Sequence, residues 1–173
     1  MIRRTIFRTV FLIFVVTSLS TQLLAVSETQ IKAVFLEKFT HLIQWPENNN
    51  SEFVICILND DNFAQTLKKV YAEKDFHTKK VNIISVLNPK DIPSCNLLFI
   101  GKNTRNAKKI TSSYAKKPIL TVSDHKGFIS DNVMITIYLN KKRFNYIINN
   151  KVAQEANVKI SYLLLKSAQE VIK

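Results

Sequence analysis

Residues 53–61 read FVICILNDD, and their order gives the strongest local indication of the fold class. Its first six residues form a short, continuous apolar run, which is typical of a strand buried on both faces of a parallel sheet. The polar residues that follow end the strand, and 61–72 then repeats apolar side chains at helical spacing. A buried strand that leads directly into an amphipathic helix indicates an α/β fold.

Strands and helices continue to alternate on both sides of this unit. We expect further strands at 81–87, 97–100 and 118–122, and further helices at 28–43 and 104–115. Two last strands, 133–139 and 143–148, are separated by three polar residues, which predicts an antiparallel hairpin. Residues 150–173 are expected to be helical, with Asn157 as a candidate break because Asn tolerates the left-handed conformation. The sequence predicts one compact α/β domain whose mostly parallel sheet is flanked by helices on both faces, with the antiparallel hairpin near the C-terminus.

The first 27 residues have the order of a secretory signal peptide. Three arginines lie within residues 1–8, an apolar run covers 10–19, and small or weakly polar residues follow. We expect cleavage after Ala25 or Ser27, which leaves a folded domain at 28–173 in the periplasm. The alternative is an uncleaved anchor, because no charge lies between Thr9 and Ser27.

The chain is basic, with 25 Lys and Arg against 13 Asp and Glu and a formal net charge of +12. Such a balance fits nucleic acid, an anionic membrane or an acidic partner. The lysine pairs are spread along the chain and do not interleave with aromatic residues, as a nucleic-acid groove requires. Abundant Lys, Asn and Ile are also what an AT-rich genome produces. Because export removes the chain from nucleic acid as well, we expect no nucleic-acid partner.

Cys56 and Cys95 are the two cysteines of the chain. An even count in an exported protein predicts a disulfide, because the compartment is oxidising. One cysteine lies in the first predicted strand and the other just before the third, and these strands are commonly neighbours in a doubly wound sheet. The alternative is two buried free thiols.

The loops at the carboxyl ends of the parallel strands are the candidate ligand site, because ligands bind there in open α/β sheets. Five residues in these loops form the candidate set: Asp60, Asp61, Gly101, Asp124 and Gly127. They would suit a small polar or cationic ligand. The structural alternative is stronger: Asp60 or Asp61 caps the next helix, Asp124 belongs to a turn, and each glycine serves a turn that a side chain would obstruct.

No local signature of catalysis is present. The three histidines, His41, His77 and His125, lack metal-ligand spacing. The chain has no glycine-rich phosphate loop and no G-x-S-x-G elbow. We therefore expect no enzyme, and neither a catalytic site, a metal site nor a cofactor.

Seven short motifs follow one another along the predicted mature chain. They are Phe35-Leu36…Phe39…Trp45-Pro46, Cys56…Asp60-Asp61…Phe63, Cys95-Asn96-Leu97-Leu98-Phe99-Ile100, Pro118-Ile119-Leu120-Thr121-Val122-Ser123-Asp124…Gly127-Phe128, Met134-Ile135, Arg143-Phe144…Ile148-Asn149 and Lys159-Ile160-Ser161…Leu164-Leu165-Lys166…Ala168. With these motifs the chain resembles the YfiR family of exported bacterial proteins over residues 30–171. The pair Cys56 and Cys95 lies where family members carry a cysteine pair. Asp131-Asn132 departs from the glycine pair usual there, and the extra cysteine pair of some relatives is absent.

The resemblance implies a compact periplasmic α/β domain that binds proteins and is not an enzyme. The characterised role in the family is to inhibit a membrane-bound diguanylate cyclase by binding its periplasmic part, and an outer-membrane protein can sequester the inhibitor. The expected partner is thus the periplasmic part of a cyclase or of another sensor protein, and an outer-membrane protein is a second candidate. The chain could also form a homodimer. Exposed apolar residues around Leu36 and Leu165 are the expected anchors. The alternative function is a periplasmic small-ligand-binding protein.

Overall fold

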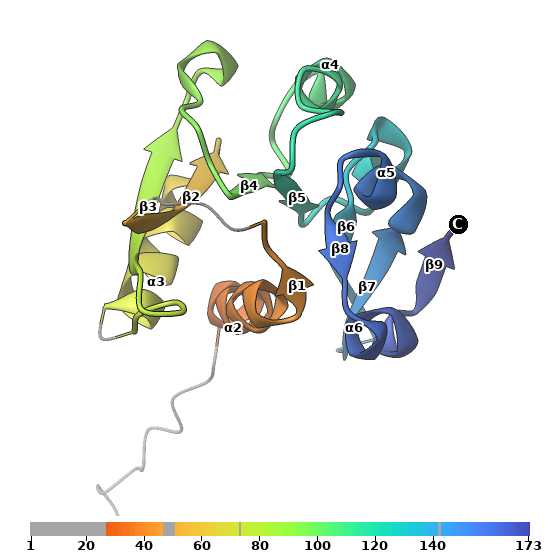
Figure 1. Ribbon diagram of the computed structural model, residues 1–173, viewed down its shortest axis with the longest axis horizontal. Helices are drawn as coiled ribbons and strands as arrows, with labels where there is room; N and C mark the ends of the chain where they lie inside the picture. The colour runs from red at the N-terminus through yellow and green to blue at the C-terminus, as the bar shows by residue number, and fades with distance from the viewer. Residues whose placement is uncertain (1–26, 47–50, 73, 142) are drawn as a thin grey trace, which may run out of the picture.

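The computed structural model describes residues 27–46, 51–72, 74–141 and 143–173. A seven-stranded sheet in the order β3-β2-β4-β5-β6-β7-β9 forms its centre (Figure 1). The strands are β2 (Glu52–Leu58), β3 (Lys80–Val86), β4 (Leu97–Ile100), β5 (Leu120–Ser123), β6 (Ile135–Asn140), β7 (Arg143–Asn149) and β9 (Glu170–Ile172). Neighbouring strands are parallel except for the antiparallel pair β6 and β7. The predicted mostly parallel sheet and its hairpin are confirmed.

Helices cover both faces of the sheet, as expected. One face packs against α2 (Glu28–His41), α3 (Asp61–Tyr71), α5 (Asn150–Glu155) and α6 (Tyr162–Ser167), which all contribute to the larger apolar core. The other face packs against α4 (Ala107–Ser112), the 3₁₀ turn η2 (Lys126–Asp131) and residues near the 3₁₀ turn η1 (Pro89–Asp91). Among the described residues, no helix combines the length and the apolar character needed to cross a membrane.

The first described helix, α2, is held within this fold from its first residue. Ser27 caps it in a capping box with Gln30, so the backbone N–H groups at its start are satisfied. Most of the predicted signal peptide, residues 1–26, lies outside the described residues. The helix ends at His41, two residues earlier than expected, because β1 (Ile43–Gln44) then pairs with β8 (Lys159–Ile160).

The expected exposure of Leu36 is wrong. Leu36 is fully buried and Phe39 is 2% exposed, because α2 packs on one face of the sheet between α3 and α6 (Figure 1). Leu165, the other expected anchor, is half-buried and packs against the same core. The large apolar residues that face solvent on these two helices are Val34 on α2, which is 44% exposed, and Tyr162 and Leu163 on α6, which are 72% and 66% exposed.

The single helix predicted for 150–173 is also wrong, whereas its break is confirmed. Asn157 adopts the left-handed conformation with φ 56°, and α5 ends just before it. The chain then forms β8, the short helix α6 and β9, which extends the sheet beside β7. The hydroxyl of Tyr146 donates a 3.0 Å hydrogen bond to the carbonyl of Leu164, so α6 is fixed against β7.

The predicted disulfide joins Cys56 in β2 to Cys95 just before β4. Both residues are buried, and their Cα atoms lie 6.1 Å apart across the two adjacent strands. The bridge belongs to the core on the α4 face of the sheet. It closes a 39-residue separation, so it restricts the unfolded chain as well as the native fold.

Candidate functional site

The carboxyl ends of β2, β4 and β5 meet at one edge of the sheet. Leu58 is paired with Ile100, and Ile100 is paired with Ser123, so all three strands end at the same level. The loops that follow therefore bring Asp60, Gly101 and Asp124 together, whereas Asp61 and Gly127 are exposed. Three of the five candidate residues thus converge at the place where parallel sheets bind ligands.

Gly101 is required by a close approach of two backbones. Its N–H donates a 2.9 Å hydrogen bond to the carbonyl of Leu58. A Cβ at this position would lie 2.9 Å from the carbonyl oxygens of both Leu58 and Asn59. The expectation that a side chain would obstruct this turn is confirmed, and the cause is contact with backbone rather than a positive φ.

Asp60 caps α3, as the structural alternative predicted. Its Oδ1 accepts a 3.0 Å hydrogen bond from the backbone N–H of Phe63. Asp61 occupies the first turn of the same helix, where a carboxylate is favourable to the helix dipole. Gly127 lies in η2, and the nearest atoms to a Cβ built there belong to the ring of His125. These contacts account for local structure without a ligand.

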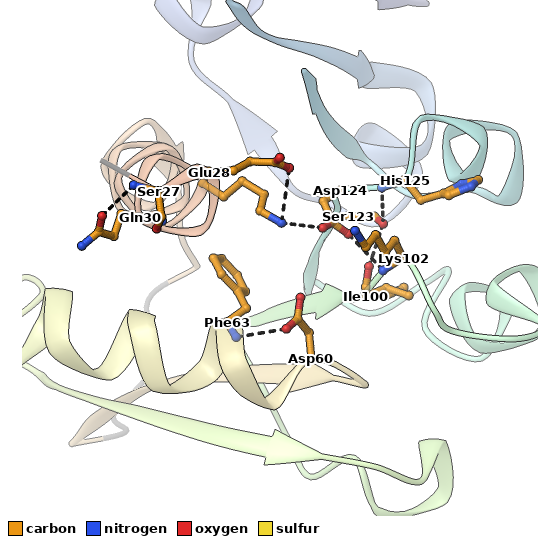
Figure 2. A network of polar contacts seen from close by, with 11 residues as sticks. Ser27, Glu28, Gln30, Asp60, Phe63, Ile100, Lys102, Ser123, Asp124 and His125 are labelled. Carbon is orange, nitrogen blue, oxygen red and sulfur yellow. Dashed lines mark hydrogen bonds and ion pairs between the residues drawn. The ribbon is translucent and has the colours of Figure 1, made fainter. Parts of the chain in front are cut away.

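Asp124 forms an ion pair with a buried lysine (Figure 2). The Nζ of Lys32 donates a 2.7 Å hydrogen bond to Oδ2 of Asp124, and the backbone N–H of Lys102 donates to Oδ1 at 3.0 Å. The side chains of Lys32 and Asp124 are 7% and 4% exposed. The ion pair therefore joins α2 to the carboxyl end of β5. The ammonium group of Lys32 occupies the place beside Asp124 where a cationic ligand would bind.

Neighbouring groups make the surroundings of Lys32 both charged and aromatic. Glu28, one turn earlier on α2, lies 3.9 Å from its Nζ, but the Glu28 side chain is 56% exposed. The Lys32 Nζ also lies 5.8 Å from the centre of the Phe63 ring, which belongs to α3. One side chain thus contacts α2, α3 and the β5 loop, so it fixes the position of α2 on the sheet.

Lys32 was not among the predicted site residues, although the sequence carries a signal that it is buried. Lys32 precedes Leu36 by four residues and Phe39 by seven, so it is in phase with the buried face of α2. A lysine at such a position needs a buried anion, because an unpaired buried charge is costly. The partner itself, 92 residues away, has no local signal in the sequence.

Ser123 and His125 do not form a nucleophilic pair. The Ser123 hydroxyl donates a 2.6 Å hydrogen bond to the carbonyl of Ile100 and accepts from the backbone N–H of His125 at 3.1 Å. The His125 ring instead packs against Phe128, with ring centres 4.5 Å apart. In the described ranges, no group of three or more His, Cys, Asp or Glu residues could hold a metal ion.

A cavity of about 680 Å³ lies near the opposite, amino end of β2. Its aromatic lining includes Trp45, Phe53 and Phe76, and the Trp45 and Phe53 rings lie 4.8 Å apart. His41 and His77 complete its aromatic wall. Sequence reasoning did not find this cavity because its residues come from separate segments.

The sequence profile of the family described as YfiR/HmsC-like matches residues 29–169. The chain belongs to the YfiR/HmsC-like family. Membership confirms the resemblance and supports a regulatory role in the periplasm, in a family of regulators rather than enzymes. The Cys56–Cys95 disulfide fits the oxidising compartment in which such a protein works. No curated protein matches the chain in sequence.

Two solved structures share the fold. A conserved domain protein from Vibrio cholerae has a TM-score of 0.60 at 9% identity, and the match covers 84% of this chain and 60% of that one. An ABC domain in complex with L-Trp from Streptococcus pneumoniae has a TM-score of 0.58 at 14% identity, with 83% and 60% covered. The YfiR/HmsC-like chain thus spans about 60% of the length of each. At these identities the likeness shows the fold alone.

Proposed function

We propose that the chain is an exported regulator that inhibits a membrane-bound diguanylate cyclase by binding the periplasmic part of that enzyme. The mature protein is the folded domain that is left when a signal peptide within residues 1–27 is removed, by cleavage after Ala25 or Ser27. The family match over 29–169 carries the proposal, because it spans nearly all of the mature domain. The inhibitory role is what the resemblance to the YfiR family implies. An outer-membrane protein that competes for the inhibitor is the expected releasing partner.

A periplasmic domain cannot touch a cyclase active site in the cytoplasm. It acts by binding one conformation of the periplasmic region more tightly than another, so that the equilibrium shifts. Shifting the ratio of active to inactive conformations from 99:1 to 1:99 takes about 5.5 kcal/mol of differential binding free energy. Such a difference requires an interface of about 800 Å² per partner with a few apolar or aromatic anchors.

The α6 surface, defined by Tyr162 and Leu163, supplies anchors of this kind. Their side chains are 72% and 66% exposed, and they lie side by side in sequence at the start of α6. An aromatic and an aliphatic residue left in water together have most to gain from burial in an interface. We place the contact with the cyclase on this surface.

The binding test uses the purified mature protein as bait on detergent-solubilised membranes of its host. We expect recovery of a protein that carries a cyclase domain. Tyr162→Ser with Leu163→Ser should lower that recovery about tenfold or more, since anchors contribute at least 1–2 kcal/mol each. Leu87→Ser is the matched control, because Leu87 is 76% exposed at the end of β3. Recovery of no cyclase or sensor by the unchanged protein would contradict the proposal.

The alternative is a periplasmic small-ligand-binding protein. The likeness to the Streptococcus pneumoniae domain that binds L-Trp favours it at the level of fold. Against it, the buried Lys32–Asp124 pair fills the strand-end position that a cationic group would need. Calorimetry of the mature protein with amino acids separates the two functions: micromolar binding of one of them, together with failure to recover a cyclase, would favour the alternative.

A further inference from the structure

Positive charge is concentrated in one part of the chain. Residues 88–118 contain seven Lys or Arg and one Asp, a net charge of +6, which is half of the +12 of the whole chain. This segment includes η1, β4 and α4. Lysine is spread along the chain, but acidic residues offset more of the positive charge outside this segment than within it, so the local excess of positive charge lies here.

The same segment lines a hollow of about 390 Å³ that lies between η1 and α4 and opens to solvent. Three cationic side chains line it, Lys90, Arg105 and Lys109, and no acidic residue does. Within the described part of the chain, none of the three forms an ion pair. Three like charges around one hollow repel each other, and an anion bound between them removes that repulsion.

The cavity also has an apolar wall and a defined rim. Ile110 is 7% exposed and Tyr114 is partly buried, so both present carbon surface to the cavity. Lys117 lies with its Nζ 5.0 Å from the Tyr114 ring centre, which adds a fourth cation beside this wall. On the other side, the Asn88 side chain accepts a 3.0 Å hydrogen bond from the Lys90 N–H, so the start of η1 is fixed.

We propose that this cavity binds a phosphate group whose attached carbon skeleton lies against Tyr114 and Ile110. A guanidinium presents paired N–H donors that match phosphate oxygens, and two ammonium groups balance the remaining negative charge. Three positive charges exceed the single negative charge of a carboxylate, so they match a phosphate group better. The phosphate belongs either to a soluble phosphorylated compound or to the headgroup of an anionic phospholipid.

The test compares two triple variants of the mature protein with equal net charge. Lys90→Gln, Arg105→Gln and Lys109→Gln remove the lining cations, whereas Lys68→Gln, Lys69→Gln and Lys151→Gln remove three exposed lysines elsewhere. Glycerol phosphate is titrated at constant ionic strength and followed by amide resonances in NMR. We expect chemical-shift changes confined to the amides of residues 88–91 and 105–114. The affinity for glycerol phosphate should fall at least tenfold in the first variant and stay unchanged in the second.

Vesicles of phosphatidylglycerol, compared with phosphatidylcholine, separate the two sources. Each cation near an anionic surface contributes roughly fivefold, so a lipid source predicts about a 100-fold loss in vesicle binding for the first variant. If the protein does not bind the vesicles, or if both variants bind them equally well, the phosphate belongs to a soluble compound. The proposal is overturned if the amide resonances of 88–91 and 105–114 do not shift with glycerol phosphate, or if both variants lower the affinity for glycerol phosphate to the same extent.

Discussion

Replacing Lys32 by Met leaves Asp124 as a buried carboxylate without its counter-charge. Both side chains are less than 10% exposed, and breaking such a pair from one side costs about 3–5 kcal/mol. Asp124 keeps the hydrogen bond from the Lys102 N–H, so we expect the lower end, about 3 kcal/mol. For a domain of this length that loss lowers the midpoint of thermal unfolding by about 10 °C.

The control and the coupling measurement make this prediction specific. Lys38→Met removes an exposed charge from the same helix and should change the unfolding free energy by no more than about 0.5 kcal/mol. Adding Asp124→Asn to Lys32→Met should recover at least 1 kcal/mol, because the remaining buried charge is gone. Denaturant unfolding of the parent protein, Lys32→Met, Lys38→Met, Asp124→Asn and the double variant measures these values. A loss below about 1 kcal/mol for Lys32→Met, or strictly additive effects in the double variant, would refute the reasoning.

Three further predictions concern the bridge, export and pH. Purified protein should show no free thiol before reduction, and replacing Cys56 and Cys95 by Ala should cost about 4 kcal/mol of stability in the chain-entropy model; ready thiol labelling without reductant would contradict this. Intact-mass analysis of periplasmic protein should give a first residue between Thr21 and Glu28, and a retained Met1 with membrane attachment would contradict export. Burial raises the pKa of Tyr71 to about 12 in the fold, against about 10 in the unfolded chain. The stability from this group is present below pH 10 and is lost as the pH rises from 10 to 12, by up to roughly 3 kcal/mol. Tyr71→Phe should not show this loss of stability.

The central β-α units were predictable because their signals are local. The apolar run of β2 has no alternation, and Asp60 follows it at the position of a helix cap. The disulfide followed from compartment and count, and strand adjacency brings its two cysteines within bridging distance. Each of these inferences needs only nearby residues and one general rule of sheet construction.

The C-terminal segment was mispredicted because short elements share the periodicity of a long helix. Val171 repeats the apolar spacing of α6, yet it pairs with Ile148 of β7 at the sheet edge. That pairing depends on a strand more than twenty residues earlier, which the local pattern does not reveal. The same limit applies to the site, since Lys32 is recognisable as buried but its partner Asp124 is set by the fold.

Inhibition of a membrane diguanylate cyclase is tested most directly by the amount of cyclic di-GMP in the host. The gene is deleted cleanly in a host that encodes a membrane cyclase with a periplasmic region, and the nucleotide is quantified in the deletion strain and after complementation. We expect the cyclic di-GMP level to rise on deletion and to return to its original value on complementation with the exported protein. An unchanged level of cyclic di-GMP in the deletion strain would contradict this expectation.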